Sequence, residues 1–121
     1  MWSPYLINNL NIYCISLPQA THVVQWGNSD VYKIGGKVFA IIGTADSGPT
    51  VTFKASDLAF EILSDSPGLR PAPYMASRGL KWIQHFAQPG LSDDSLRDHI
   101  RASYDMVAAA LTRKKRADLG I

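Results

Sequence analysis

The feature that most constrains the fold is the pair Gly35-Gly36, which stands between two apolar-rich runs at 31–34 and 37–42. Glycine accepts a positive φ at both central positions of a tight hairpin turn without steric cost. The pair therefore predicts an antiparallel β-hairpin with a two-residue turn.

The register of this hairpin predicts which side chains share a face. If Ile34 pairs with Lys37, the alternation of side chains along each strand places the two aromatic rings on one face. That face is composed of Tyr32, Ile34, Phe39 and Ile41. The other face is composed of Val31, Lys33, Val38, Ala40 and Ile42. The first face is fit for a core.

Length and charge restrict the class of protein. A chain of 121 residues with 46% hydrophobic residues fits a single domain over 1–121, with a basic C-terminal tail from about residue 113. The net charge of +2 comes from 12 basic and 10 acidic residues, and four of the basic ones lie in 113–116. The rest of the chain has a net negative charge. The basic character is thus local, and composition does not imply a general polyanion-binding surface.

Cysteine content and the first residues indicate a compartment. Cys14 is the single cysteine, so it has no intramolecular partner for a disulfide, which favours a reducing compartment. The opening residues have no basic segment, and Asn8, Asn9 and Asn11 interrupt their apolar run, unlike a signal peptide. No apolar run is long enough for a bilayer. We expect a cytoplasmic protein that has no membrane partner.

The N-terminal half predicts a helix followed by a meander. Ser3 can cap a helix whose first position is Pro4, and Pro18 ends it. The apolar stripe between them is Leu6, Ile7, Leu10, Tyr13, Cys14 and Leu17. Residues 22–26 predict a strand before the hairpin, and 50–54 predict a strand after it.

The C-terminal half predicts two helices with extended segments between them. Ser56 caps the first of these helices, whose apolar side is Leu58, Phe60, Ile62 and Leu63. Two prolines make 70–75 an edge strand or a loop. Residues 80–86 predict a strand with Leu80, Trp82 and Phe86 on one side.

Ser92 caps the last helix, and the basic run 113–116 closes it, where cations oppose the negative end of the helix dipole. Its buried stripe is Leu96, Ile100, Tyr104, Val107 and Leu111. Strands joined by short turns, with helices at the ends, predict an α+β two-layer sandwich whose antiparallel sheet is covered mainly on one face.

Several short motifs carry a family resemblance in their order and spacing. They are Leu17-Pro18, Trp26-Gly27, the segment 31–40, Thr52-Phe53-Lys54, the segment 71–75, Gly79-Leu80-Lys81-Trp82, and Ser103-Tyr104 with Val107. Together they resemble the MmcQ/YjbR family of small prokaryotic proteins. The resemblance implies a frataxin-like α+β fold with two winged hairpins, and a DNA-binding function. Many relatives have a histidine where this chain has Tyr74, so no role of that histidine is carried over.

Three lysines around the predicted hairpins are candidates for phosphate contacts. Lys33, Lys37 and Lys54 would contribute salt-sensitive affinity that does not depend on base sequence. The alternative is that they are edge lysines that discourage strand-to-strand aggregation. Gly35-Gly36-Lys37 lacks the spacing and the following helix of a phosphate loop.

Two further groups are candidates for binding. Arg78 and Lys81 form a basic loop beside Trp82, which could stack on a base or pack in the core with neighbouring apolar residues. Tyr74 either lines a groove near them or packs with its hydroxyl on the backbone. The densest positive patch is Arg113, Lys114, Lys115 and Arg116, whose alternative interpretation is a solvated helix end.

Residues with catalytic or metal-binding chemistry form no constellation in the sequence. No histidine neighbours Ser103-Tyr104 to make a nucleophile pair, and Tyr104 on the apolar stripe predicts packing. His22, His85 and His99 lack ligand-like spacing. The remaining acidic pair, Asp93 and Asp94, is explained by the helix start. We expect no catalytic residue, no metal and no cofactor.

These observations predict a monomeric, non-enzymatic domain that binds nucleic acid, with DNA as the expected partner, through hairpin wings and basic patches. The alternative is a protein–protein or small-ligand adaptor with a groove near Tyr74, Arg78 and Trp82. Salt separates the two, because binding led by phosphates weakens steeply as salt rises.

Overall fold

The structure is a computed structural model that describes residues 4–46 and 48–121, so the predicted cap Ser3 lies outside the described residues. The helices are α1 (Pro4–Ser16), α2 (Asp57–Leu63), α3 (Asp93–Ala109) and α4 (Arg113–Leu119), and a short 3-10 helix, η1, spans Ala76–Arg78. The strands are β1 (Thr21–Gln25), β2 (Ser29–Ile34), β3 (Lys37–Ala45), β4 (Gly48–Lys54), β5 (Leu69–Pro71) and β6 (Trp82–His85).

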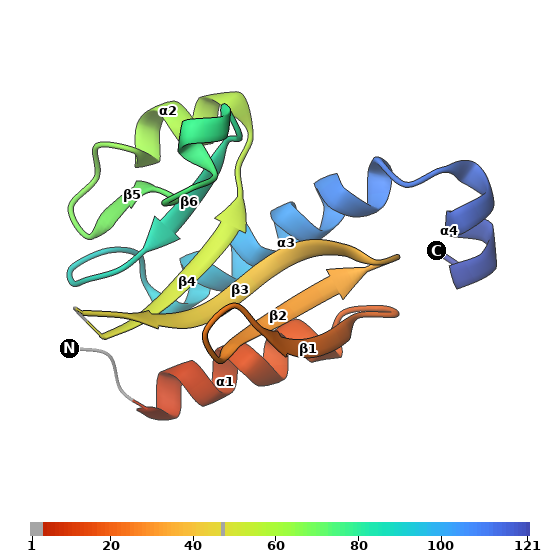
Figure 1. Cartoon of the computed structure of the whole chain (residues 1–121), viewed down its shortest axis with the longest axis horizontal. Coiled ribbons are helices and arrows are strands. Elements are labelled where there is room, and N and C mark those ends of the chain that lie inside the picture. Colours follow the sequence, from red (N-terminus) through yellow and green to blue (C-terminus); the bar gives the residue numbers. More distant parts are fainter. Residues whose placement is uncertain (1–3, 47) are drawn as a thin grey trace.

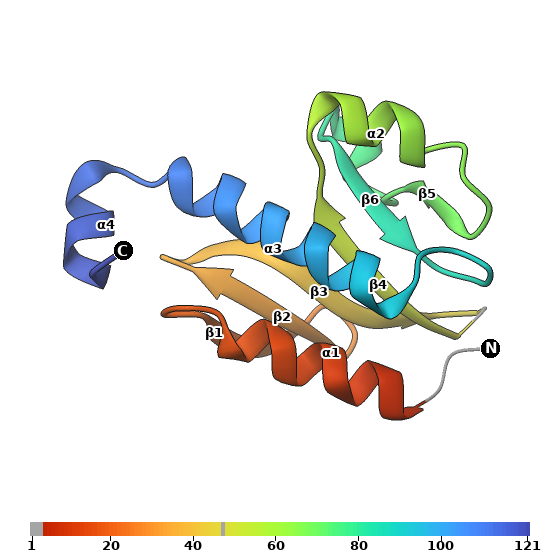
Figure 2. The same ribbon diagram turned by 180° about the vertical axis from the view of Figure 1, so that it is seen from behind.

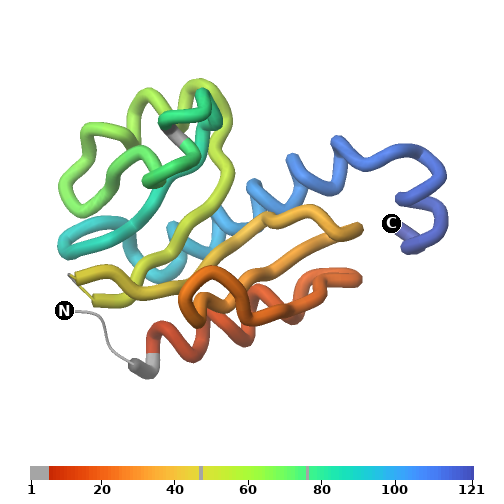
Figure 3. The backbone as a smooth tube through the Cα atoms, viewed as in Figure 1, coloured from red at the N-terminus to blue at the C-terminus, as the bar shows by residue number. Residues whose placement is uncertain are grey.

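All strand pairs of the sheet are antiparallel, in the order β1-β2-β3-β4-β6-β5. The chain runs as a meander from β1 to β4 and then returns through β5 to β6 (Figure 3). Both long helices, α1 and α3, lie on the same face of the sheet (Figures 1 and 2). The predicted two-layer α+β sandwich is confirmed, and the proline-containing β5 is at the sheet edge, as predicted.

The β2–β3 hairpin has the predicted turn and one irregularity. Ile34 pairs with Lys37 across Gly35-Gly36. Further along, Tyr32 pairs with Ala40 and not with Phe39, because a β-bulge inserts one residue into β3.

The bulge changes the face on which the later residues of β3 lie. The rings of Tyr32 and Phe39 remain on the core side, with centroids 6.4 Å apart. Beyond the extra residue the alternation is inverted, so Ala40 and Ile42 join the core and Ile41 lines a groove on the opposite face. The prediction that Ile41 shares the core face was therefore wrong, and so was the placement of Ala40 and Ile42 opposite it.

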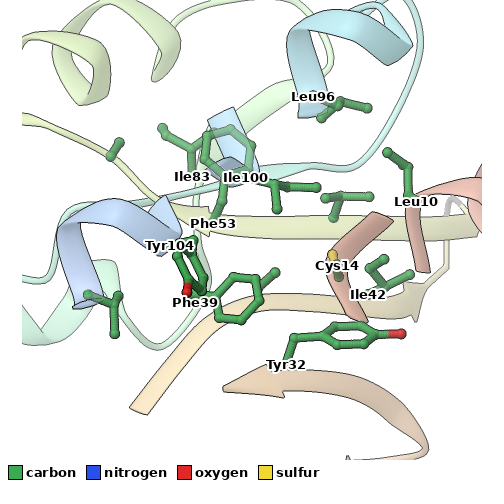
Figure 4. Packing of buried hydrophobic residues seen from close by; sticks show 14 of the residues in the cluster. Leu10, Cys14, Tyr32, Phe39, Ile42, Phe53, Ile83, Leu96, Ile100 and Tyr104 are labelled. Atoms are coloured by element: carbon green, nitrogen blue, oxygen red, sulfur yellow. The ribbon is translucent and has the colours of Figure 1, made fainter. Parts of the chain in front are cut away.

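The core lies between the sheet and the two long helices (Figure 4). Phe39 packs edge-on against Tyr104 of α3, with ring centroids 5.3 Å apart. The predicted stripe of α3 is buried at Leu96, Ile100, Tyr104 and Val107. In α1, the buried members of the predicted stripe are Leu10 and Cys14, and Leu17 is buried just after the helix.

Caps determine where the later helices begin. Ser56 and Ser92 cap α2 and α3 as predicted, each through a side-chain oxygen that accepts a backbone N–H bond. The basic run does not close α3. It forms the separate helix α4, which Thr112 caps and which ends before Gly120 at a left-handed φ of 74°.

Two predicted apolar faces differ in the structure. In α2 only Leu63 is buried, whereas Leu58 and Ile62 are exposed, because α2 is a short helix that packs on β5 and β6 through its last turn. In β6, Ile83 and His85 face the core, and Leu80 precedes the strand. Among the described residues, no helix combines the length and apolar character that crossing a membrane requires.

Candidate nucleic-acid interface

A groove of about 630 Å³ lies where the β2–β3 turn, the end of β4 and the link between α3 and α4 meet. Three lysines from separate elements line it: Lys37 at the start of β3, Lys54 at the end of β4, and Lys115 in α4. Its apolar walls are Val38, Leu80, Trp82, Val107, Ala110 and Leu111. We call it the lysine groove.

The glycine turn packs directly against one wall of this groove. A Cβ placed on Gly35 would lie 2.7 Å from a methyl carbon of Leu111, and Gly35 has a φ of +59°. The backbone angle favours glycine, and a Cβ at this position would also require the Leu111 side chain to shift. This contact holds the turn, and Lys37 directly after it, beside the link that leads into α4 and Lys115.

A buried hydroxyl fixes the end of β4. The backbone N–H of Lys54 donates to Oγ of Ser103 at 2.9 Å, and that hydroxyl donates to the carbonyl of Phe39 at 2.7 Å. Ser103 has no exposed surface. It joins α3 to β3 and β4 at the point where Lys54 reaches the groove.

The charge of the lysine groove is not compensated by direct contact. Among the ion pairs formed by the described residues, none includes Lys37, Lys54 or Lys115. Lys81 lies in the chain between Leu80 and Trp82, which both line the groove, and it forms an ion pair with Asp57 at 3.1 Å. The three lysines are thus available to an anionic ligand.

The other basic candidates lie outside this groove. Arg78 is exposed on η1, and Lys33 is half-buried in β2. Arg113 and Lys114 are exposed on α4, whereas Arg116 of the same helix lines a separate pocket near Tyr104. The structure therefore brings together two of the three predicted hairpin lysines, Lys37 and Lys54, and one residue of the C-terminal basic run, Lys115.

A groove was expected near Tyr74, Arg78 and Trp82, and in the described part of the chain Trp82 and Tyr74 line two different grooves. Trp82 is 8% exposed and forms a wall of the lysine groove. Tyr74 is 87% exposed and lines a different groove of about 300 Å³, which it shares with Ile41 and with Trp26, itself 61% exposed. Ile41 faces away from the core, so this second groove lies on the side of the sheet opposite α1 and α3.

Several candidate reactive groups have packing roles. The hydroxyl of Tyr104 donates to the carbonyl of Pro18 at 2.5 Å, and burial raises the pKa of Tyr104. Burial raises the pKa of the Cys14 thiol to about 12, and this keeps the thiol protonated and unreactive.

The three histidines lie apart and have different surroundings. His22 contacts Asp30 at 2.8 Å on the surface, His85 is buried, and His99 stacks on the Phe53 ring with centroids 5.1 Å apart. Burial lowers the pKa of both His85 and His99. Within residues 4–46 and 48–121, no group of three or more His, Cys, Asp or Glu side chains is placed to hold a metal ion.

Comparison with known proteins identifies the family. The family model described as YjbR matches residues 15–106. The chain belongs to the YjbR family. Three residues of the lysine groove, Lys37, Lys54 and Trp82, lie inside the segment that matches the YjbR model. Lys115 and the rest of α4 follow that segment.

Two individual proteins are similar to this YjbR-family chain. The Uncharacterized protein YbdF of Escherichia coli O157:H7 is 30% identical over 87 residues, which cover 70% of this chain and 69% of that relative. The crystal structure of protein DR2400 of Deinococcus radiodurans, a DUF419 domain, has a TM-score of 0.81 at 18% identity and covers 95% of this chain and 88% of that one. At this identity the structural match shows that the two share a fold.

Some groove residues were given other roles by the sequence pattern. The sequence pattern predicted Val107 and Leu111 as members of the buried stripe of the last helix, and Leu80 as part of a strand face. Each is placed by tertiary packing, so spacing along the chain carries no signal of a shared groove. A signal does exist for α4, because Thr112 before the basic run and Gly120 after it are the usual residues at the two ends of a short helix.

Proposed function

We propose that the protein is a monomeric, cytoplasmic, non-enzymatic module that binds nucleic acid through the lysine groove. The observation that supports this most is that Lys37, Lys54 and Lys115, from three separate elements, line one groove and have no carboxylate contact among the described residues. Lysines placed in this way neutralise phosphates and release counterions, which gives affinity that depends steeply on salt.

The non-enzymatic part of the proposal is supported by the roles of the candidate nucleophiles. The hydroxyls of Ser103 and Tyr104 are bonded to backbone carbonyls, and the Cys14 thiol is buried. Each of these groups has a packing role, and none lines the lysine groove.

A salt-titrated binding assay against duplex DNA, single-stranded DNA and RNA tests the proposal. We expect K37E/K54E to weaken binding to unrelated sequences alike, and to flatten the dependence of log K on log salt by about one unit per lost phosphate contact. We expect K115E to weaken binding in the same way, and K114E is its matched control, because Lys114 is the exposed neighbour that does not line the groove. Equal binding by parent and K37E/K54E would contradict the proposal, as would a parent that does not bind at low salt.

The second groove favours a second candidate function, an adaptor for a planar ligand or peptide. Trp26 and Tyr74 line it, both exposed and both with a left-handed backbone, at φ of 50° and 68°. Strained, exposed aromatic residues are enriched at ligand sites. Binding by this groove would change little with salt and would be lost in W26A/Y74A, whereas K37E/K54E would leave it intact.

A further inference from the structure

We infer that the lysine groove receives an unstacked base of a single-stranded nucleic acid, and that the protein therefore prefers single strands to duplexes. This inference rests on the proposed function and specifies which form of nucleic acid the same groove takes.

The walls of the groove are the first reason. Most of the lining is apolar: Leu80 and Trp82 lie before and at the start of β6, Val107 lies near the end of α3, and Leu111 lies in the link that follows α3. A volume of about 630 Å³ is in the range of pockets that accept small organic ligands. Phosphate contacts alone need lysines on an open surface, and they give no reason for an apolar hollow between those lysines.

The state of the bases is the second reason. In a duplex the bases are stacked and paired, so a duplex can present phosphates and base edges to the lysines but no base face to the apolar walls. A single strand can turn a base out of the stack and place it on apolar or aromatic side chains. Only the single strand uses both the charge and the apolar walls of this groove.

The arrangement of charge is complementary to such a ligand. Lys37, Lys54 and Lys115 come from three separate elements and line the same groove as the apolar residues, so we expect the phosphates next to an inserted base to contact these lysines. The hydroxyl of Thr112, which also lines the groove, already accepts the N–H of Lys115 at 3.1 Å. Because most of the lining is apolar, we expect little discrimination between bases.

The test uses the full chain with three fluorescent probes: a single-stranded oligonucleotide, a hairpin duplex of the same strand, and a single strand of the same length with abasic sugars. We expect the parent to bind the single strand most tightly, and the abasic strand no better than the duplex. Leu80→Ser should weaken single-strand binding roughly fivefold to tenfold and leave duplex binding unchanged. Leu80 is 41% exposed, so the variant should fold.

Leu58→Ser is the matched control, because Leu58 is 66% exposed on α2 and does not line the groove. It should bind all three probes as the parent does. Equal affinity for single strand, abasic strand and duplex would overturn the inference while leaving the proposed function in place. No binding of any probe at low salt would overturn both. Dodecanoate is tested separately as a non-nucleic-acid ligand, and its binding with no binding of the oligonucleotides would also overturn both and assign the groove to an acyl anion.

Discussion

The hydroxyl of Ser103 in α3 accepts the backbone N–H of Lys54 at 2.9 Å, so the last long helix holds the end of the strand that carries a groove lysine. In Ser103→Ala this N–H and the Phe39 carbonyl both lose a buried partner. We expect the free energy of unfolding to fall by roughly 2 to 3 kcal/mol, measured by urea denaturation. Ser77→Ala, at an exposed serine, is the control and should change stability little. Equal stabilities of the two variants would show that the Ser103 bridge contributes nothing.

Tyr104 is expected to be a structural residue. Tyr104→Ala removes a ring packed on Phe39 and should cost roughly 3 kcal/mol of stability. Tyr104→Phe keeps the ring and loses only the bond to Pro18, so it should cost about 1 kcal/mol. Melting temperatures and binding curves of both variants are the measurement. Lost binding with an unchanged melting temperature would make Tyr104 a site residue instead.

The two turn glycines should differ in their tolerance of a side chain. Both have positive φ, so alanine at either position is strained by about 1 kcal/mol or more. A Cβ on Gly35 also meets Leu111, whereas nothing lies within 4 Å of a Cβ on Gly36. We therefore expect Gly35→Ala to destabilise more than Gly36→Ala in thermal unfolding, and to weaken binding in the groove. The reverse order would contradict the packing of the turn on Leu111.

Stability should fall on mild acidification. Burial lowers the pKa of His99 below its usual value of 6.5, and it lowers the pKa of His85 in the same direction. At pH values between the lowered pKa values of the folded state and about 6.5, the unfolded chain binds more protons than the folded chain. The stability present above about pH 6.5 is therefore lost progressively as the pH falls through the lower folded pKa values.

His99→Gln isolates one part of this effect. The variant should show a shallower decline of the denaturation midpoint between about pH 7.5 and about pH 5 than the parent. The decline that remains is assigned to His85. If parent and variant decline in parallel, the burial of His99 has no part in the pH dependence.

Cys14 should react slowly with thiol reagents in the native state. It is fully buried between α1 and the sheet, and its raised pKa of about 12 leaves almost no thiolate near neutral pH. Labelling by a chromogenic disulfide should become fast only as urea unfolds the chain. Rapid labelling of the folded protein would mean that α1 opens from the sheet in the native state.

Local signals were sufficient for most of the fold. Gly35-Gly36, Ser56 and Ser92 each determine a turn or a helix start through the backbone of a few neighbouring residues, and each prediction was confirmed. The bulge at Phe39 was not predictable in this way. It depends on how β3 must bend to pair with both β2 and β4, and this is a property of the assembled sheet.

The site was predictable only in part, for the same physical reason. Lys37 and Lys54 were candidates because they lie near hairpins, and Lys115 because it lies in a basic run. Their meeting at one groove depends on α4 turning back beside Gly35, which no spacing of residues records. Leu58 was predicted to be buried because it is an apolar residue of a predicted helix. It is exposed, because α2 is short and buries only Leu63.

The strand order bears on how fast this chain can fold. From β1 to β4 each strand pairs with the next in sequence, and such local pairings close short loops and form quickly. The pairing of β4 with β6, as between Val51 and His85, joins segments far apart in the chain and is the slower event. The lysine groove draws residues from both sides of that join. The groove therefore forms only when folding is complete, and we expect a chain in which β4 and β6 are not yet paired to lack this binding site.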